Sequence, residues 1–366
     1  IMMKIFSFGA LFLSMLLMAE GQNAKPPKVK DAKNVELKKK TPPKDPKLAS
    51  YYINLKTSPR AGKAQPIETS LPLKLEKGDR ICFIGNLLLD AERRYGHLET
   101  LIHQHHPKHE VTVRNLAWPA DEIDLMPRPD NFGDLDQHLT YFKADVIIAA
   151  YGYNESFAGN EGLPAFKQRL EKFLTHLKSH AYNGKTAPRI VLVSPVAGET
   201  YGGGKAVMRN GNNLALYTHA MDDVARKTQV GFVNLLSYDV PKNRTIDGHA
   251  LNKMGHAHFA DSTFEALFSN AATQINESLR QLVVEKASQF FYRYRPLNTF
   301  YYTGGRNKSY GYLDFLPAMR NFDLMVGNRD KAIHATVSTG KPAKPDDSNL
   351  PVLDQVVQAR GANKFL

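Results

Sequence analysis

An apolar run near residue 80 ends in a turn at which an α/β protein can carry a nucleophile. Residues 80–84 read Arg-Ile-Cys-Phe-Ile, and Gly85-Asn86-Leu87 follow directly. A serine at such a strand-to-helix turn can attack a carbonyl carbon once a neighbouring base activates it. This chain has an amide at position 86 and an aliphatic side chain at position 87. The turn therefore offers the place for a nucleophile without supplying one.

Strand-like and helix-like segments alternate around this turn. Short apolar runs predict strands over 80–84, 110–116, 144–150, 189–193 and 230–235. Amphipathic patterns predict helices over 90–105, 163–179, 213–227 and 253–288, the last with a break near Asn270. Parallel strands need crossover connections. We therefore expect an α/β fold: a three-layer α/β/α flavodoxin-like sandwich with a five-stranded parallel sheet.

Ligand sites in such sheets lie outside the carboxyl ends of the strands. Five loops are expected at that edge, over 85–89, 117–124, 151–159, 194–205 and 237–251. They carry aromatic side chains suited to sugar rings or acyl chains: Trp118, Tyr151, Tyr153 and Phe157. Aromatic residues at a sheet edge also cover the core, so both interpretations stay open.

In order and spacing the loops resemble the motif blocks of the SGNH (GDSL-type) hydrolases, over about residues 78–285. The resemblance implies an architecture that cleaves esters, often acyl or acetyl groups on lipids and carbohydrates. In that family a G-D-S turn supplies the serine, and a glycine and an asparagine line the oxyanion hole. A D-x-x-H loop supplies the aspartate and the histidine.

Three residues of this chain are catalytic candidates through the resemblance. Asn154 falls on the family's asparagine, which would donate its side-chain N–H to a developing oxyanion. Asp247 falls on the aspartate, and His249 lies one residue before the histidine position. The candidate substrate-binding residues are Gly85, Asn86, Trp118, Ala120 and Tyr153.

Three family positions do not match: Leu87 stands at the serine, Ala120 at the glycine and Ala250 at the histidine. Because nucleophile and base act as a unit, acyl transfer by the family mechanism is not expected. One hypothesis is a catalytically degenerate protein that binds envelope polysaccharide or an envelope protein. The alternative is an active carbohydrate or acyl esterase with a relocated base such as His249.

A degenerate branch of the family, found in exported bacterial proteins, is a closer resemblance. The shared motifs are Gly78-Asp79-Arg80-Ile81 with Ile84-Gly85-Asn86, then Gly96-His97-Leu98-Glu99, then Arg114-Asn115-Leu116-Ala117-Trp118, and the aromatic–basic run 290–298. The branch implies a nucleophile position that is often not serine.

The N-terminal residues predict export. A nearly uninterrupted apolar run over 5–18 follows Met2-Met3-Lys4, and Ala19-Glu20-Gly21 offers small residues for cleavage. We expect a signal peptide over 1–21, with an uncleaved anchor as the alternative, and a periplasmic, envelope-associated or extracellular location. A basic, proline-interrupted linker and connecting segment is expected over 22–77. Residues 25–47 could contact anionic polymers or headgroups, or serve as a spacer.

The remaining composition gives no indication of nucleic-acid binding, an internal disulfide or a metal site. The net charge is +12, yet no zinc-finger, recognition-helix or RNP-type motif indicates nucleic-acid binding. The single cysteine, Cys82, cannot form an internal disulfide. Histidines group at 103–109 and 249–258, but solvated side chains are the simpler interpretation, so no metal or cofactor is expected.

We expect an SGNH-like domain over 78–288 and an aromatic–basic extension over 289–366. The extension is expected to pack back onto the domain, with docking of an envelope protein as the alternative. After Asp330 the composition turns polar, which predicts an extended tail.

Overall fold

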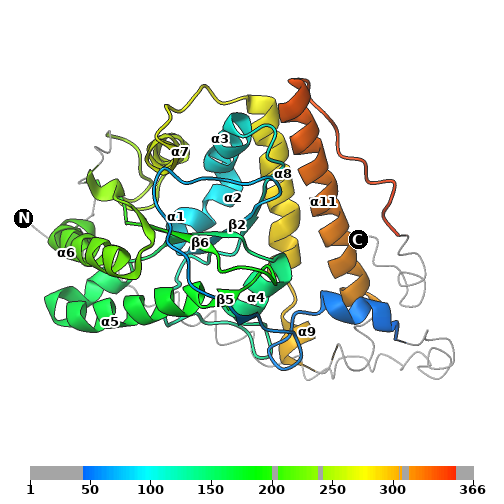
Figure 1. Cartoon of the computed structure of the whole chain (residues 1–366), viewed down its shortest axis with the longest axis horizontal. Coiled ribbons are helices and arrows are strands. Elements are labelled where there is room, and N and C mark those ends of the chain that lie inside the picture. The colour runs from blue at the N-terminus through cyan, green and yellow to red at the C-terminus, as the bar shows by residue number, and fades with distance from the viewer. Residues whose placement is uncertain (1–43, 200–204, 238–241, 305, 307–312, 352–366) are drawn as a thin grey trace, which may run out of the picture. The chain divides into compact units, whose positions relative to one another are not determined.

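The computed structural model describes residues 44–199, 205–237, 242–304, 306 and 313–351 (Figure 1). These residues belong to one compact unit, Lys44–Val356. The expected signal peptide and most of the expected basic linker lie outside the described residues. Among the described helices, none combines the length and the apolar character that a membrane crossing requires.

A five-stranded parallel sheet forms the centre of the unit. Its strands are β2 (Arg80–Gly85), β3 (Thr112–Asn115), β4 (Val146–Ala150), β6 (Arg189–Val193) and β7 (Gly231–Val233). They lie in the order β3-β2-β4-β6-β7, and every neighbouring pair is parallel. In sequence order this is 2-1-3-4-5, the flavodoxin-like order. The predicted fold class is confirmed.

Successive residues of each strand face opposite sides of the sheet, and both sides are buried. Ile81 and Phe83 pack with helices α3 (His97–His105) and α7 (Lys253–Phe268). Cys82 and Ile84 pack with the helices of the other face. Those helices are α4 (Leu135–Phe142), α5 (Gly159–Lys178) and α6 (Lys205–Thr228). Strands buried on both faces read as continuous apolar runs, which explains why the sequence reveals them clearly.

The prediction of one continuous helix over 90–105 is wrong. The structure has three short helices, α1 (Leu87–Asp90), α2 (Glu92–Tyr95) and α3. Gly96 separates α2 from α3 with φ at 66°, in the left-handed region. Since glycine adopts this conformation without steric cost, the chain can change direction there. The break expected near Asn270 is present, between α7 and α8 (Glu277–Tyr294).

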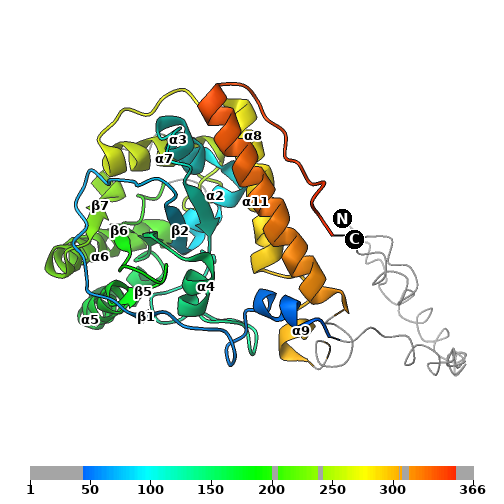
Figure 2. The same cartoon turned by 45° about the vertical axis from the view of Figure 1, so that its right-hand side comes forward.

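The C-terminal extension is helical and lies against the domain. α8 runs through residue 288, so the expected boundary falls inside a helix, and α9 (Phe300–Thr303) follows. α11 (Phe315–Thr339) packs beside α8 (Figures 1 and 2). The prediction of an extended tail after Asp330 is wrong as far as Thr339, because α11 continues to that residue. The residues expected as a connecting segment also belong to the unit, with Leu73 and Leu75 in its core.

Short elements complete the described residues. β1 (Gly62–Lys63) pairs antiparallel with β5 (His180–Ala181) in a separate two-stranded sheet. The described residues also include the short 3₁₀ helices η2 (Pro46–Tyr51), η3 (Glu155–Ala158) and η4 (Leu235–Ser237).

Candidate functional site

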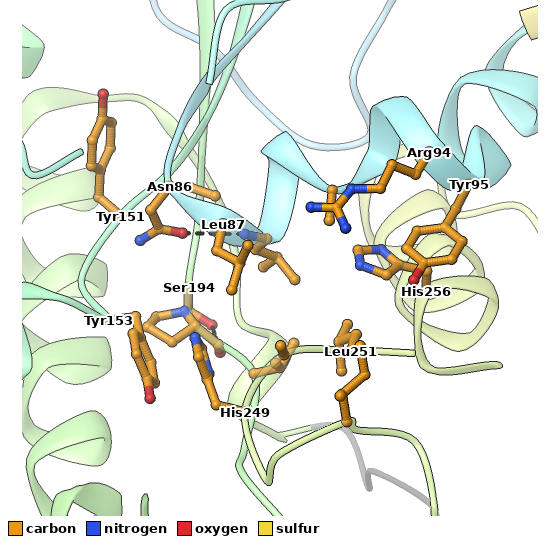
Figure 3. A pocket seen from close by; sticks show the side chains of 17 residues that line it. Asn86, Leu87, Arg94, Tyr95, Tyr151, Tyr153, Ser194, His249, Leu251 and His256 are labelled. Carbon is orange, nitrogen blue, oxygen red and sulfur yellow. Dashed lines mark hydrogen bonds between the residues drawn. The ribbon is translucent and has the colours of Figure 1, made fainter. Parts of the chain in front are cut away.

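A small cavity of about 70 Å³ lies at the carboxyl ends of β2, β4 and β6, where the sequence predicts the site (Figure 3). Its walls come from α1, α2, the loops after β4 and β6, and the segment leading into α7. The lining residues are Asn86, Leu87, Leu88, Ala91, Arg94, Tyr95, Ala150, Tyr151, Tyr153, Ser194, Pro195, Val196, Ile246, His249, Ala250, Leu251 and His256. Most of this surface is aliphatic or aromatic.

The turn after β2 places hydrocarbon where a nucleophile would stand. Asn86 caps α1: its Oδ1 accepts a hydrogen bond from the Leu88 N–H at 3.4 Å. Leu87 follows and lines the cavity. Gly85 has φ at 125°, and a Cβ there would overlap the carbonyl oxygen of Ala150. The turn is therefore built tightly onto β4, but no reactive group stands at its end.

His249 lines the cavity, whereas Asp247 does not orient it. The Oδ1 of Asp247 accepts from the backbone N–H groups of His249 at 2.9 Å and Ala250 at 2.7 Å. The Nδ1 of His249 is buried and has no hydrogen-bond partner among the described residues. Burial lowers the pKa of His249 to about 4, although the charge of Asp247 acts in the opposite direction. The imidazole is therefore neutral at physiological pH.

Asn154 does not line the cavity, and its side chain connects two loops. Its Nδ2 donates to the carbonyl oxygen of Asp121 at 3.1 Å. Next to it, the buried Glu155 accepts from the N–H groups of Ile123 at 3.1 Å and Gly152 at 2.9 Å. Burial raises the pKa of Glu155 to about 7. These contacts fix the loop after β3 against the loop after β4.

Two of the expected substrate-binding residues also lie outside the cavity. Ala120 is exposed on the turn after β3. Trp118 is enclosed between the guanidinium groups of Arg128 and Arg295, which lie 4.3 and 4.2 Å from its ring centroid. Such cation–π contacts favour a structural role for this ring. Asn86 and Tyr153 do line the cavity, and Gly85 shapes the turn that forms its edge.

A buried histidine–carboxylate pair borders the cavity at its other end. The Nδ1 of His256 lies 3.2 Å from Oε1 of Glu92, whose Oε2 accepts from the Leu98 N–H at 3.0 Å. The ring of Tyr95 stacks on the imidazole, with centroids 4.3 Å apart. The two partners come from α2 and α7, so no local motif could have identified them as a pair.

The hydroxyl groups around the cavity are bound or weakly acidic. The Oγ of Ser194 donates to the carbonyl of Pro195 at 3.0 Å and accepts from the Leu235 N–H at 2.8 Å. Burial raises the pKa of Tyr153 to about 12 and that of Tyr151 well above its usual value. Within the described part of the chain, none of these hydroxyl groups hydrogen-bonds to either imidazole.

In the described ranges, no three histidine, cysteine, aspartate or glutamate side chains lie close enough together to hold a metal ion. In the first histidine group, His103 contacts Glu99 at 3.3 Å, and the Nδ1 of His106 lies 2.9 Å from the carbonyl of Ile102. Cys82 is buried in the sheet, and burial raises its thiol pKa to about 12.

No protein-family model matches the chain, and no curated protein matches it significantly. Similar solved structures include Axe2, an acetylxylan esterase from Geobacillus stearothermophilus, at 16% identity with a TM-score of 0.41. It covers 53% of this chain and 96% of its own. AlAXEase, an acetyl xylan esterase, shares 16% identity with a TM-score of 0.39, and covers 51% of this chain and 99% of its own.

A third similar structure is LAE5, an alpha/beta hydrolase enzyme from the metagenome of Lake Arreo, Spain. It shares 17% identity with a TM-score of 0.38, and covers 54% of this chain and 99% of its own. Likeness at these levels gives no information on activity or substrate. The fold class instead rests on the strand order of this chain and on the cavity at the expected sheet edge. In architecture, the described part of the chain is a flavodoxin-like α/β sandwich.

Proposed function

We propose that this protein is a catalytically degenerate SGNH-hydrolase-like protein that binds a small chemical group in the cavity at the carboxyl edge of its sheet. The observation that carries the proposal is the position of Leu87. It lines the cavity at the serine position, and Ala250, at the histidine position, lines the same cavity. Hydrocarbon at both positions leaves neither an attacking atom nor a proton acceptor in the family arrangement.

The electrostatics of His249 weigh against a relocated base. A general base works best when its pKa lies near the operating pH, and the pKa of His249 is lowered to about 4. A triad histidine is also oriented by a carboxylate that accepts from its ring nitrogen. Here the Asp247 carboxylate accepts backbone N–H groups, and the buried Nδ1 of His249 has no partner among the described residues.

The size of the cavity limits what it can hold. Its volume of about 70 Å³ is less than half of the roughly 150 Å³ of an engineered cavity that binds benzene. A group of a few heavy atoms fits, whereas a whole sugar ring does not. The proposed ligand is therefore a short substituent, either free or carried on an envelope polysaccharide or a partner protein.

We place this function at the cell envelope. The apolar run over 5–18 supports export, and the lysine-rich residues 25–47 support contact with anionic polymers or headgroups. Both segments precede the compact unit almost entirely in the sequence, so they could tether it.

Retention on immobilised envelope polysaccharide, with and without its acyl substituents, tests the binding function. Ala250→Leu fills part of the cavity wall, and Ala215→Leu makes the same change at an exposed position of α6. We expect the wild-type protein and Ala215→Leu to be retained on the substituted polymer, and Ala250→Leu to elute early. Equal retention of all three proteins on both polymers would contradict binding in the cavity.

A further inference from the structure

The cavity carries positive charge that no lining acid balances. Its walls include one cation, the solvent-exposed guanidinium of Arg94, and no aspartate or glutamate. Among the described residues Arg94 has no ion-pair partner, although most other arginines of the unit do. Glu92, also on α2, is buried and already contacts His256 and the backbone of Leu98.

Arg94, Tyr95 and His256 lie at one end of the cavity (Figure 3). Figure 3 shows the guanidinium of Arg94 extending over the cavity on the same side as His256 and Tyr95. His256 is held there by Glu92 at 3.2 Å and by the stacked ring of Tyr95. The middle of the cavity is bordered by Leu87 and Leu251. A ligand that fits has an anionic end and a short apolar body.

We propose that the cavity binds a short-chain carboxylate, with its carboxyl group between Arg94 and His256 and its carbon chain against Leu87 and Leu251. This inference rests on the proposed binding function and specifies the ligand class. Arginine presents paired N–H donors that match a carboxylate, and hydrogen bonds to ionised groups are about twice as strong as neutral ones. The volume of about 70 Å³ is roughly half of the benzene-sized case, which suits a chain of two or three carbon atoms with the carboxyl oxygens toward the exposed guanidinium of Arg94.

The same carboxylate chemistry could come from a free acid or from an acidic sugar of a polysaccharide. Propionate and glucuronate represent the two sources, and propionamide is the neutral analogue of propionate. Binding of each to the purified protein is measured by ligand-observed NMR. We expect propionate to bind and glucuronate not to bind, because a sugar ring exceeds the volume of the cavity. Binding of glucuronate as well as propionate would overturn the placement of the carbon chain against Leu87 and Leu251. Binding of neither acid would overturn the inference.

Two charge-removing variants test the role of Arg94. Arg94→Gln removes the cation at the cavity, and Lys172→Gln removes one positive charge from an exposed position of α5. We expect Arg94→Gln to weaken propionate binding about 10- to 100-fold, the effect of losing a charged hydrogen-bond partner. Lys172→Gln should bind as the wild type does, and propionamide should bind at least about tenfold more weakly than propionate.

The outcomes separate this inference from the proposed function. Equal binding of propionate and propionamide, or unchanged binding in Arg94→Gln, would overturn the carboxylate assignment while leaving a binding cavity. Hydrolysis of a propionyl ester by the wild-type protein would instead overturn the proposed loss of catalysis. Thermal unfolding of each variant confirms that the loss of binding does not come from loss of fold.

Discussion

The imidazole of His249 lies flat against the phenol ring of Tyr153, with ring centroids 3.3 Å apart and planes 5° apart. This stack is the wall of the cavity on the side of β4. It explains why a histidine near the family's catalytic position is held neutral: the aromatic ring excludes water from the imidazole, and exclusion disfavours the charged form. The stack thus gives His249 a packing role in the wall of the cavity.

The first prediction concerns acid stability. The folded pKa of His249 is about 4, below its ordinary value near 6.5, so this residue contributes stability above pH 6.5 that is lost as the pH falls through 4. His249→Phe keeps the stacked ring but cannot take up a proton. We expect the free energy of unfolding to fall less in this variant between pH 6.5 and 4, by about 2–3 kcal/mol.

Denaturant unfolding at several pH values measures this difference. Glu155 acts in the opposite direction, because its raised pKa of about 7 gives stability that is lost as the pH rises from 4.5 through 7. Its contribution cancels when each variant is compared with the wild type at the same pH. His219→Phe, at an exposed position of α6, is the matched control. Parallel pH profiles for the wild type and His249→Phe would show that the stacked imidazole is not buried.

The second prediction concerns the turn after β2. Gly85→Ala should lower the free energy of unfolding by more than about 3 kcal/mol, because the added Cβ meets the backbone of Ala150 and φ is positive. Gly184→Ala has a positive φ but open space around the new atom. It should cost about 1 kcal/mol. Similar losses in the two variants would contradict the close approach of the turn to β4.

The third prediction concerns the attachment of α11. Arg114 of β3 makes a paired contact with Asp330 of α11, at 2.5 and 3.2 Å, and both side chains are largely buried. Replacing one partner leaves a buried charge without compensation, so Arg114→Met should cost about 3–5 kcal/mol. The double variant Arg114→Met with Asp330→Leu should cost less than the sum of the single changes.

The exposed pair of Arg226 and Asp222 provides the control for this cycle. Arg226→Met should cost less than about 1 kcal/mol, as expected for ion pairs in water. Urea unfolding of the five proteins gives the coupling energy. Additive losses for Arg114 and Asp330 would mean that α11 is not anchored through this pair.

The sheet could be predicted from the sequence, whereas the helices beside it could be predicted only in part. Buried strands have uninterrupted apolar runs, but α11 alternates apolar residues with Asp323, Arg329 and Asp330. Those charges look like a solvated segment in the sequence. In the structure they pair with other elements, as Asp323 does with Arg293 of α8 at 2.9 Å. Long-range pairing of this kind leaves no local signal.

The candidate site could likewise be predicted from the sequence only in part. The five loops could be located by position, and the cavity lies among them. The directions of side chains could not: Asn154 and Asp247 stand in the expected loops, but both bond to the backbone. Glu92 and His256 stand 164 residues apart and meet only through the packing of α2 and α7.

The central claim is the loss of ester hydrolysis, and the turnover of p-nitrophenyl acetate by the purified protein tests it most directly. The wild type, His249→Ala and Asn154→Ala are compared at the same protein concentration. We predict that all three release nitrophenol at one common, non-saturating background rate. Saturable turnover by the wild type that both substitutions abolish would contradict the account.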